Sequence, residues 1–242
     1  MTNTAVWSSV SGDGEPLVAL HPGGTDSRAM EPLLAEFRDY RRILIDRPGH
    51  GRCTDSAGPW SFEEMADVVA GVLDELRVDS AHVVGCSDGA IVGLQLALRR
   101  PELVRSLVVG AGVFHHEGWR DGVLGGEPPD FMCDAYTELS PDGRDHWPVV
   151  VAKSAALHEV APQLSIADLS RLAMPALVVA GDDDEVRVEH LVEMFEALPD
   201  GELAILPRAT HGALVEKPDL LARLIRDLHR PAGNGLAPIR RA

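Results

Sequence analysis

Cysteine, lysine and long apolar stretches are all scarce in this chain of 242 residues. Its three cysteines, Cys53, Cys86 and Cys133, form an odd set without metal-ligand spacing. Such a set indicates a reducing compartment and argues against a disulfide framework. Lysine occurs only at Lys153 and Lys217, and no stretch approaches the length of a transmembrane helix. Because the first residues lack a basic region and a long apolar stretch, the sequence predicts no signal peptide and a cytoplasmic location.

Positive charge is also in short supply. The sequence has 22 lysine and arginine residues against 38 aspartate and glutamate residues, which gives a formal net charge of −16. Nucleic acids and anionic membrane surfaces would repel such a chain, so neither is expected as a partner. The charge does not reveal a substrate; the partner expected from the motifs below is a small-molecule substrate. Hydrophobic residues make up 45% and charged residues 25%, as in soluble globular proteins. The length suits one sizeable domain with room for a small insertion.

Segments typical of strands alternate along the chain with segments typical of helices. The expected strands are Ala5–Val10, Leu17–His21, Arg42–Asp46, Ala81–Val84, Leu103–Val109, Ala176–Ala180 and Glu202–Leu206. The expected helices are Arg28–Asp39, Ser61–Leu76 with a capping box of Ser61 and Glu64, Ala90–Leu98, Val188–Leu198 and Leu214–Leu228. This alternation predicts an α/β fold, with a mostly parallel sheet and helices on both faces.

The alternation stops between Gly112 and Met174, a gap too long for an ordinary loop. Aromatic residues and a proline- and glycine-rich section fall in this gap, and Val149–His158 is typical of a helix. We therefore expect residues 113–174 to form a small helical cap that walls a pocket at the strand ends. Residues 1–112 and 175–230 would then form the core domain, and residues 231–242 a disordered tail.

The pentapeptide Gly85-Cys86-Ser87-Asp88-Gly89 has the pattern G-x-S-x-G, with a predicted strand before it and a predicted helix after it. This context is typical of a nucleophile elbow, a sharp strand-to-helix turn that exposes a serine hydroxyl. Glycines are needed there because side chains would collide with the adjacent strand and helix. The alternative is a glycine-rich turn in which Ser87 only caps the helix.

A serine nucleophile needs a base, and the base needs an acid to orient it, in the chain order Ser, acid, His. Of ten histidines, only His211 lies in a loop after a late strand. The preceding strand ends in Asp182, Asp183 and Asp184, and on spacing alone any of these could serve as the acid. The alternatives are a structural loop histidine and a solvated acidic turn.

Acyl transfer also needs an oxyanion hole. One donor should be the backbone N–H of Asp88, which follows the nucleophile. The other should come from the loop after an earlier strand, where Gly23 and Gly24 let a backbone N–H approach a bound carbonyl oxygen. The alternative for these two glycines is an ordinary tight turn.

Three further features leave alternatives open. The Asp88 side chain would either pair with a cationic group on a substrate or act only as an acidic residue at a helix N-terminus. Cys86 is expected to be a packing residue and not a second nucleophile. His115 and His116 would line the pocket or bind a metal, but adjacent side chains seldom converge on one ion. The sequence therefore predicts no metal site and no cofactor.

Together these motifs resemble the α/β-hydrolase family nearly from end to end. His21-Pro22-Gly23-Gly24 is similar to its oxyanion loop, and residues 46–52 are similar to its D-x-x-G-x-G-x-S loop, with Cys53 in place of the serine. The resemblance implies the α/β-hydrolase fold and Asp184 as the acid, three residues after Gly181. The Ser-Asp-Gly form of the elbow resembles small esterase-, lactonase- and biphenyl-hydrolase-like members.

The favoured hypothesis is a serine hydrolase that cleaves a small ester, thioester or lactone through an acyl-enzyme on Ser87, with Asp184 and His211 as partners. A second hypothesis uses the same triad for C–C bond hydrolysis, perhydrolysis or natural-product tailoring. A third is a weakly catalytic ligand-binding or signalling protein, since a fold alone does not fix function.

Overall fold

A computed structural model describes residues 6–230 of the chain. Within this range seven strands form one sheet in the order β1-β3-β2-β4-β5-β6-β7, and only the edge strand β1 runs antiparallel to its neighbour. The strands are β1 Ser8–Ser11, β2 Pro16–Leu20, β3 Arg41–Ile45, β4 Ala81–Cys86, β5 Val104–Gly110, β6 Ala176–Asp183 and β7 Gly201–Thr210. The predicted, mostly parallel sheet is confirmed.

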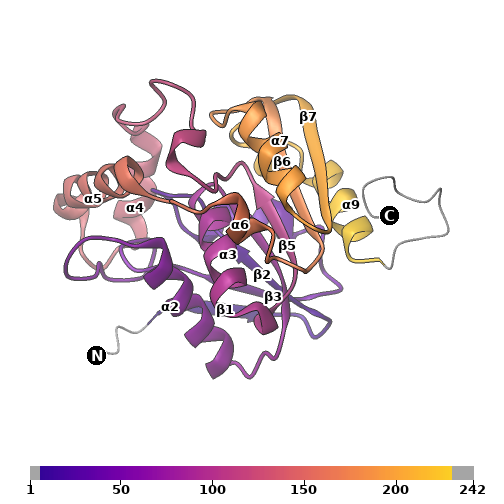
Figure 1. Ribbon diagram of the computed structural model, residues 1–242. Coiled ribbons are helices and arrows are strands. Elements are labelled where there is room, and N and C mark those ends of the chain that lie inside the picture. Colours follow the sequence, from indigo (N-terminus) through magenta and orange to yellow (C-terminus); the bar gives the residue numbers. More distant parts are fainter. Residues whose placement is uncertain (1–5, 231–242) are drawn as a thin grey trace.

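Helices cover both faces of the sheet (Figure 1). Apolar residues of α2, α3 and α7 pack in one buried cluster, and those of α1, α8 and α9 pack in another. Their bounds are α1 Glu31–Leu34, α2 Phe62–Glu75, α3 Asp88–Arg99, α7 Val188–Ala197, α8 Ala213–Glu216 and α9 Pro218–Leu228. Successive residues of a strand point to opposite faces, so Val83 joins the first cluster and Val84 the second.

The chain between β5 and β6 contains no strand of the sheet, and its main elements are helices. These are α4 Asp130–Leu139, α5 Trp147–Val160 and the short α6 Ile166–Leu169. Helices α4 and α5 lie together, away from β7 and α9 (Figure 1). The helix expected at Val149–His158 is therefore present and extends by two residues at each end.

The helix expected over Arg28–Asp39 is wrong in length. Only a 3-10 turn at Ser27–Met30 and the four residues of α1 form there. The segment after α1 is contacted by Arg226 of α9. Its guanidinium pairs with Asp39 and lies over the rings of Phe37 and Tyr40, both of which are buried. Tertiary contacts thus override the local helical pattern.

The single helix expected over Leu214–Leu228 is wrong, because Lys217 leaves helical geometry before Pro218 and divides the segment into α8 and α9. Ser61 caps α2 by accepting the Glu64 N–H, but its hydroxyl donates to Glu63 and the Glu64 side chain makes no described return bond, so the predicted capping box forms only in part. The predicted tail, residues 231–242, lies outside the described residues. No helix within residues 6–230 is both long and apolar enough to cross a membrane.

Candidate active site

The parallel strands bring the predicted site residues to one edge of the sheet. His21, Ser87, Asp184 and His211 each follow directly after the last residue of a strand, namely β2, β4, β6 and β7. These four strands run in the same direction. Their carboxyl ends therefore form a common edge, where open α/β sheets bind ligands.

Ser87 occupies a strained turn between β4 and α3. Its backbone has φ +52° and ψ −119°, outside the regions that side-chain-bearing residues favour. The turn is possible only without side chains on either flank. A Cβ on Gly85 would lie 2.5 Å from the Ala90 Cα, and one on Gly89 would lie 2.5 Å from the Leu20 carbonyl carbon. The Ser87 side chain makes no capping hydrogen bond to α3, which argues against the alternative of a helix-capping serine.

The structure joins Ser87, His211 and Asp184 in a continuous hydrogen-bonded chain. The Ser87 Oγ lies 2.9 Å from His211 Nε2, and His211 Nδ1 lies 2.8 Å from Asp184 Oδ1. Asp184 also accepts the backbone N–H groups of Gly181 and Val186. Asp182 instead accepts the N–H of Ala209. The geometry thus selects Asp184 among the three aspartates that spacing left open.

The electrostatics of this chain favour a charged carboxylate and a basic imidazole. Burial would raise the pKa of Asp184, but the hydrogen bond and charge of His211 lower it below its ordinary value. Burial would lower the pKa of His211, but Asp184 raises it above 6.5. An imidazole held in this way, with Nδ1–H toward the acid, presents Nε2 to the Ser87 hydroxyl as an acceptor.

The Asp88 side chain binds a partner that the sequence did not reveal. Its Oδ1 lies 2.8 Å from Nε2 of His158, which comes from α5, and both side chains are largely buried. The charge of His158 overcomes the effect of burial and lowers the pKa of Asp88 to about 2. The idea that Asp88 awaits a cationic group on a substrate is therefore weakened, since the protein supplies the cation. The two residues are 70 positions apart in the chain, and no pattern in the sequence indicates their pairing.

The loop after β2 is held by hydrogen bonds to its carbonyl groups. The Pro22 carbonyl accepts from Arg47, Thr25 and the ring of His21, and the His21 carbonyl accepts from Arg47 as well. In a trans peptide the C=O and the N–H point in opposite directions. Anchoring the Pro22 carbonyl therefore fixes the direction of the Gly23 N–H. Arg47 is fully buried, and no pattern in the surrounding sequence predicts a buried guanidinium at this position.

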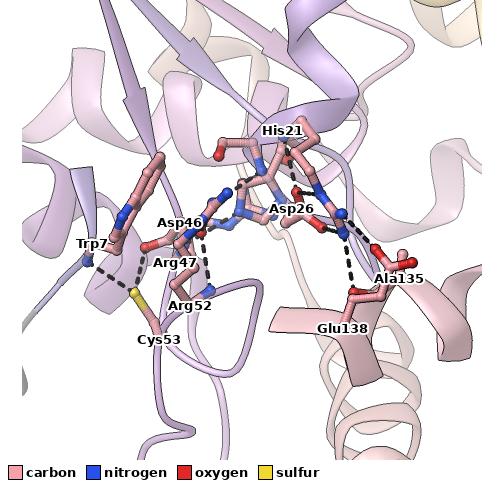
Figure 2. A network of polar contacts seen from close by, with 11 residues as sticks. Trp7, His21, Asp26, Asp46, Arg47, Arg52, Cys53, Ala135 and Glu138 are labelled. Atoms are coloured by element: carbon pink, nitrogen blue, oxygen red, sulfur yellow. Dashed lines mark hydrogen bonds and ion pairs between the residues drawn. The ribbon is translucent and has the colours of Figure 1, made fainter. Parts of the chain in front are cut away.

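The loop after β3 is braced by Asp46 (Figure 2). This buried carboxylate accepts the backbone N–H groups of Ser27 and Arg52 and pairs with the Arg52 guanidinium. Cys53 stands where the resembled family has serine, and its thiol donates to the Asp46 carbonyl while its sulfur accepts the Trp7 N–H. The cysteine therefore takes the hydrogen bonds that a hydroxyl would make.

A pocket of about 370 Å³ opens onto the Ser87 hydroxyl. Gly23, Gly24, Asp88 and His211 line it near the serine. The opposite wall belongs to the segment between β5 and β6, with the apolar side chains of Met132, Trp147, Val150 and Val151. Acidic side chains, Glu159 and Glu185, also line it, and none of the described lining residues is lysine or arginine.

The remaining candidates take structural places. His115 and His116 stack on each other, and within residues 6–230 no group of three or more His, Cys, Asp or Glu residues is placed to hold a metal ion. Burial raises the pKa of the Cys86 thiol to about 12, so it stays protonated at neutral pH and suits packing.

Known proteins resemble this chain over nearly its whole length. RutD from Azorhizobium caulinodans, a protein named for carbamate hydrolysis, is 27% identical over 249 residues, which cover 91% of this chain and 93% of RutD. Est816, described as an N-acyl homoserine lactone degrading enzyme, is 25% identical with a TM-score of 0.71, over 94% of this chain and 98% of Est816.

The enol-lactonase from Burkholderia xenovorans LB400 has a TM-score of 0.75 at 20% identity, over 94% of this chain and 97% of the lactonase. That likeness shows the fold alone. A sequence model described as the alpha/beta hydrolase family matches residues 17–224. As the order of its motifs predicted, the chain belongs to the alpha/beta hydrolase family of enzymes.

Proposed function

We propose that this chain is a serine hydrolase that cleaves small, uncharged carboxylic esters, thioesters or lactones through an acyl-enzyme on Ser87. One observation carries the proposal. His211 lies within hydrogen-bonding distance of both the Ser87 hydroxyl, at 2.9 Å, and the Asp184 carboxylate, at 2.8 Å. This is the arrangement that activates a serine near neutral pH.

In the first half of the reaction, Ser87 Oγ attacks the substrate carbonyl carbon while His211 Nε2 takes the hydroxyl proton. Asp184 keeps the proton of Nδ1 facing itself and stabilises the imidazolium that forms. When the tetrahedral intermediate collapses, the bond to the leaving oxygen or sulfur breaks and His211 gives that atom the proton. The acyl group remains on Ser87 as an ester.

In the second half, water attacks the acyl-enzyme while His211 takes its proton, and the collapse returns that proton to Ser87 Oγ. Both tetrahedral intermediates carry a negative oxygen. The N–H of Asp88 would donate to it from the start of α3, and the N–H of Gly23 or Gly24 from the β2 loop. Hydrogen bonds that hold the Pro22 carbonyl support Gly23 for this role.

The pocket supports a substrate of modest size and no negative charge. Its volume of about 370 Å³ is near the lower end for small-molecule sites. Its far wall is apolar, and Glu159 and Glu185 would repel an anionic substrate. Residues 113–174 would serve as the cap, because α4 and α5 supply that wall. Est816 supports keeping lactones in the substrate class.

A substrate panel with matched variants tests the proposal. The panel holds p-nitrophenyl esters of increasing acyl length, a lactone followed by proton release, and a carbamate. We expect the wild type to turn over short esters and Ser87→Ala to lose more than about 10³-fold in kcat. Ser170→Ala is the control, because Ser170 is exposed and its hydroxyl bonds only the Ala167 carbonyl among the described contacts.

Three outcomes separate the hypotheses. Undiminished turnover by Ser87→Ala would overturn the mechanism. Labelling of Ser87 by a fluorophosphonate without turnover of any panel member would instead favour another reaction on the same triad. A single burst of one equivalent, followed by almost no turnover, would favour a binding protein.

A further inference from the structure

A buried ion pair links the nucleophile elbow to helix α5. Asp88 directly follows Ser87, and its carboxylate meets the ring of His158 at 2.8 Å. The side chain of Asp88 is 4% exposed and that of His158 is 12% exposed. The imidazole is enclosed further by the edges of Phe62 and Trp119. Removing two charges from water costs free energy, so this buried pair differs from a surface ion pair and calls for a functional explanation.

The hydrogen bonds of His158 define its charge. Its Nε2 faces the Asp88 carboxylate, and its Nδ1 lies 2.8 Å from the Ser154 carbonyl oxygen. A neutral imidazole has one N–H, and these two acceptors each need one. His158 is therefore an imidazolium. Burial lowers its pKa, but the charge of Asp88 raises it to about 9, which agrees with this reading.

The Asp88 carboxylate lies beside both expected oxyanion donors. One donor is the N–H of Asp88 itself. The other donor belongs to the segment that begins at Gly23, where an added Cβ would lie 2.9 Å from the Asp88 Cγ. A negative carboxylate at this place opposes the negative oxygen of a tetrahedral intermediate, and low dielectric makes the opposition stronger. A cation in contact with the carboxylate would offset it.

We propose that His158 is a positioning residue for the reaction, and that its positive charge offsets Asp88 so that the adjacent donors can stabilise the oxyanion. This inference rests on the proposed function. The other charged or titratable groups near Asp88 include Arg47, His50, Cys86 and the proposed base His211. The described side-chain hydrogen bonds of Arg47 go to the His21 and Pro22 carbonyls, so His158 is the cation in contact with the carboxylate.

Four variants test the inference on the best ester of the panel. His158→Gln removes the positive charge, Asp88→Asn removes the negative charge, and the double variant removes both. Lys153→Gln is the control, because it also deletes one positive charge from α5 and breaks an ion pair, here with Asp55. Lys153 does not line the pocket at Ser87. Each variant is measured for kcat, KM and thermal unfolding.

An electrostatic role predicts unequal losses from the two halves of one ion pair. His158→Gln should lower kcat about 10²-fold, as removal of an oxyanion donor does, with a smaller change in KM. Asp88→Asn should cost far less, and the double variant should recover most of the lost kcat. The Lys153→Gln control should stay close to the wild type. Equal losses of kcat in the two single variants, or a double variant as slow as His158→Gln, would show that the ion pair has only a structural role.

A pH series keeps the inference testable if His158→Gln does not fold. The wild type should lose kcat near pH 9 as His158 gives up its proton, whereas Asp88→Asn, which needs no compensation, should not. The same alkaline loss in both proteins would overturn the inference. Failure of the proposed function looks different, since Ser87→Ala would then match the wild type whatever His158 does.

Discussion

At the scale of single residues, the site depends on which of several similar side chains meets the right neighbour. The proposed triad acid is the clearest case, because three aspartates stand in a row at the end of β6 and, of these, Asp184 is hydrogen-bonded to His211. Asp184 is buried and accepts two backbone N–H groups as well, so its position is fixed from three directions. Asp183, its neighbour, is exposed.

Replacing Asp184 should therefore harm the reaction far more than replacing Asp183. Asp184→Asn would present an amide to His211 and favour the wrong tautomer, so we expect kcat to fall about 10⁴-fold. Asp183→Asn removes the same charge one position earlier and should leave kcat within about 2-fold. Steady-state kinetics on the best ester measures both. Similar losses in the two variants would contradict the assignment.

At this scale a motif can point to a single residue, whereas a contact between distant segments leaves no mark in the sequence. Ser87 and His211 were predictable because each follows a strand in a required order. Asp184 needed the family resemblance, since spacing left three choices. His158 was one of four histidines in the presumed cap, and only the packing of α5 against the elbow distinguishes it. Arg47 was not predictable, because nothing in its local pattern marks a buried guanidinium.

At the scale of elements, the elbow between β4 and α3 requires glycine where two backbones touch. Gly89 of α3 lies against the carbonyl end of β2, and Gly85 lies against the first turn of α3. Gly71 of α2 is different, since it is exposed and an added Cβ would have nothing within 4 Å. Replacing glycine with alanine should therefore lower the stability at Gly89 and raise it at Gly71.

Gly89→Ala should lower the free energy of unfolding by about 3 kcal/mol, because the new methyl group overlaps the Leu20 backbone. Gly71→Ala should raise it by about 0.5–1 kcal/mol, because alanine favours the helix and meets no neighbour. Urea unfolding followed by circular dichroism gives both values. A stabilising Gly89→Ala would mean that the elbow does not pack as described.

Hydrophobic patterns predicted the positions of the strands and of most helices, but two helices differ from the prediction. The one expected over Leu214–Leu228 is divided at Lys217 into α8 and α9. Segment 28–39 has a helical pattern and yet forms only a turn and the short α1. Arg226, which is 187 residues from Asp39 in the chain, contacts the segment that follows α1. Local helix propensity contains no information on such a contact, so the sequence pattern alone does not predict where this helix ends.

At the scale of the whole molecule, the sheet is joined to α9 through two stacked histidines, the buried His82 and the partly buried His229. The rings of His82 on β4 and His229 after α9 lie 3.6 Å apart, and the Tyr40 hydroxyl meets His229 Nδ1 at 2.9 Å. Burial, with the nearby charges of His82 and Arg226, lowers the pKa of His229 to about 3. Burial also lowers the pKa of His82.

The molecule should consequently lose stability in mild acid. In the unfolded chain His229 binds a proton below a pKa near 6.5, whereas in the folded protein it binds one only near pH 3. The free energy of unfolding therefore falls as the pH drops from about 6.5 to about 3. His229→Phe keeps a stacked ring without a proton site and should show a shallower loss. Urea unfolding at pH 7 and pH 5 measures the difference. An equal pH dependence in both proteins would contradict this assignment.

The central claim is that Ser87 carries the acyl group during turnover, and the mass of the protein during that turnover tests it most directly. The wild type is mixed with excess p-nitrophenyl ester, quenched in acid within the first turnovers, and analysed intact and after digestion. We predict an increase equal to one acyl group, located on the peptide that contains Ser87 and absent from Ser87→Ala. An unmodified wild type that still forms product, or an acyl group on another residue, would contradict the account.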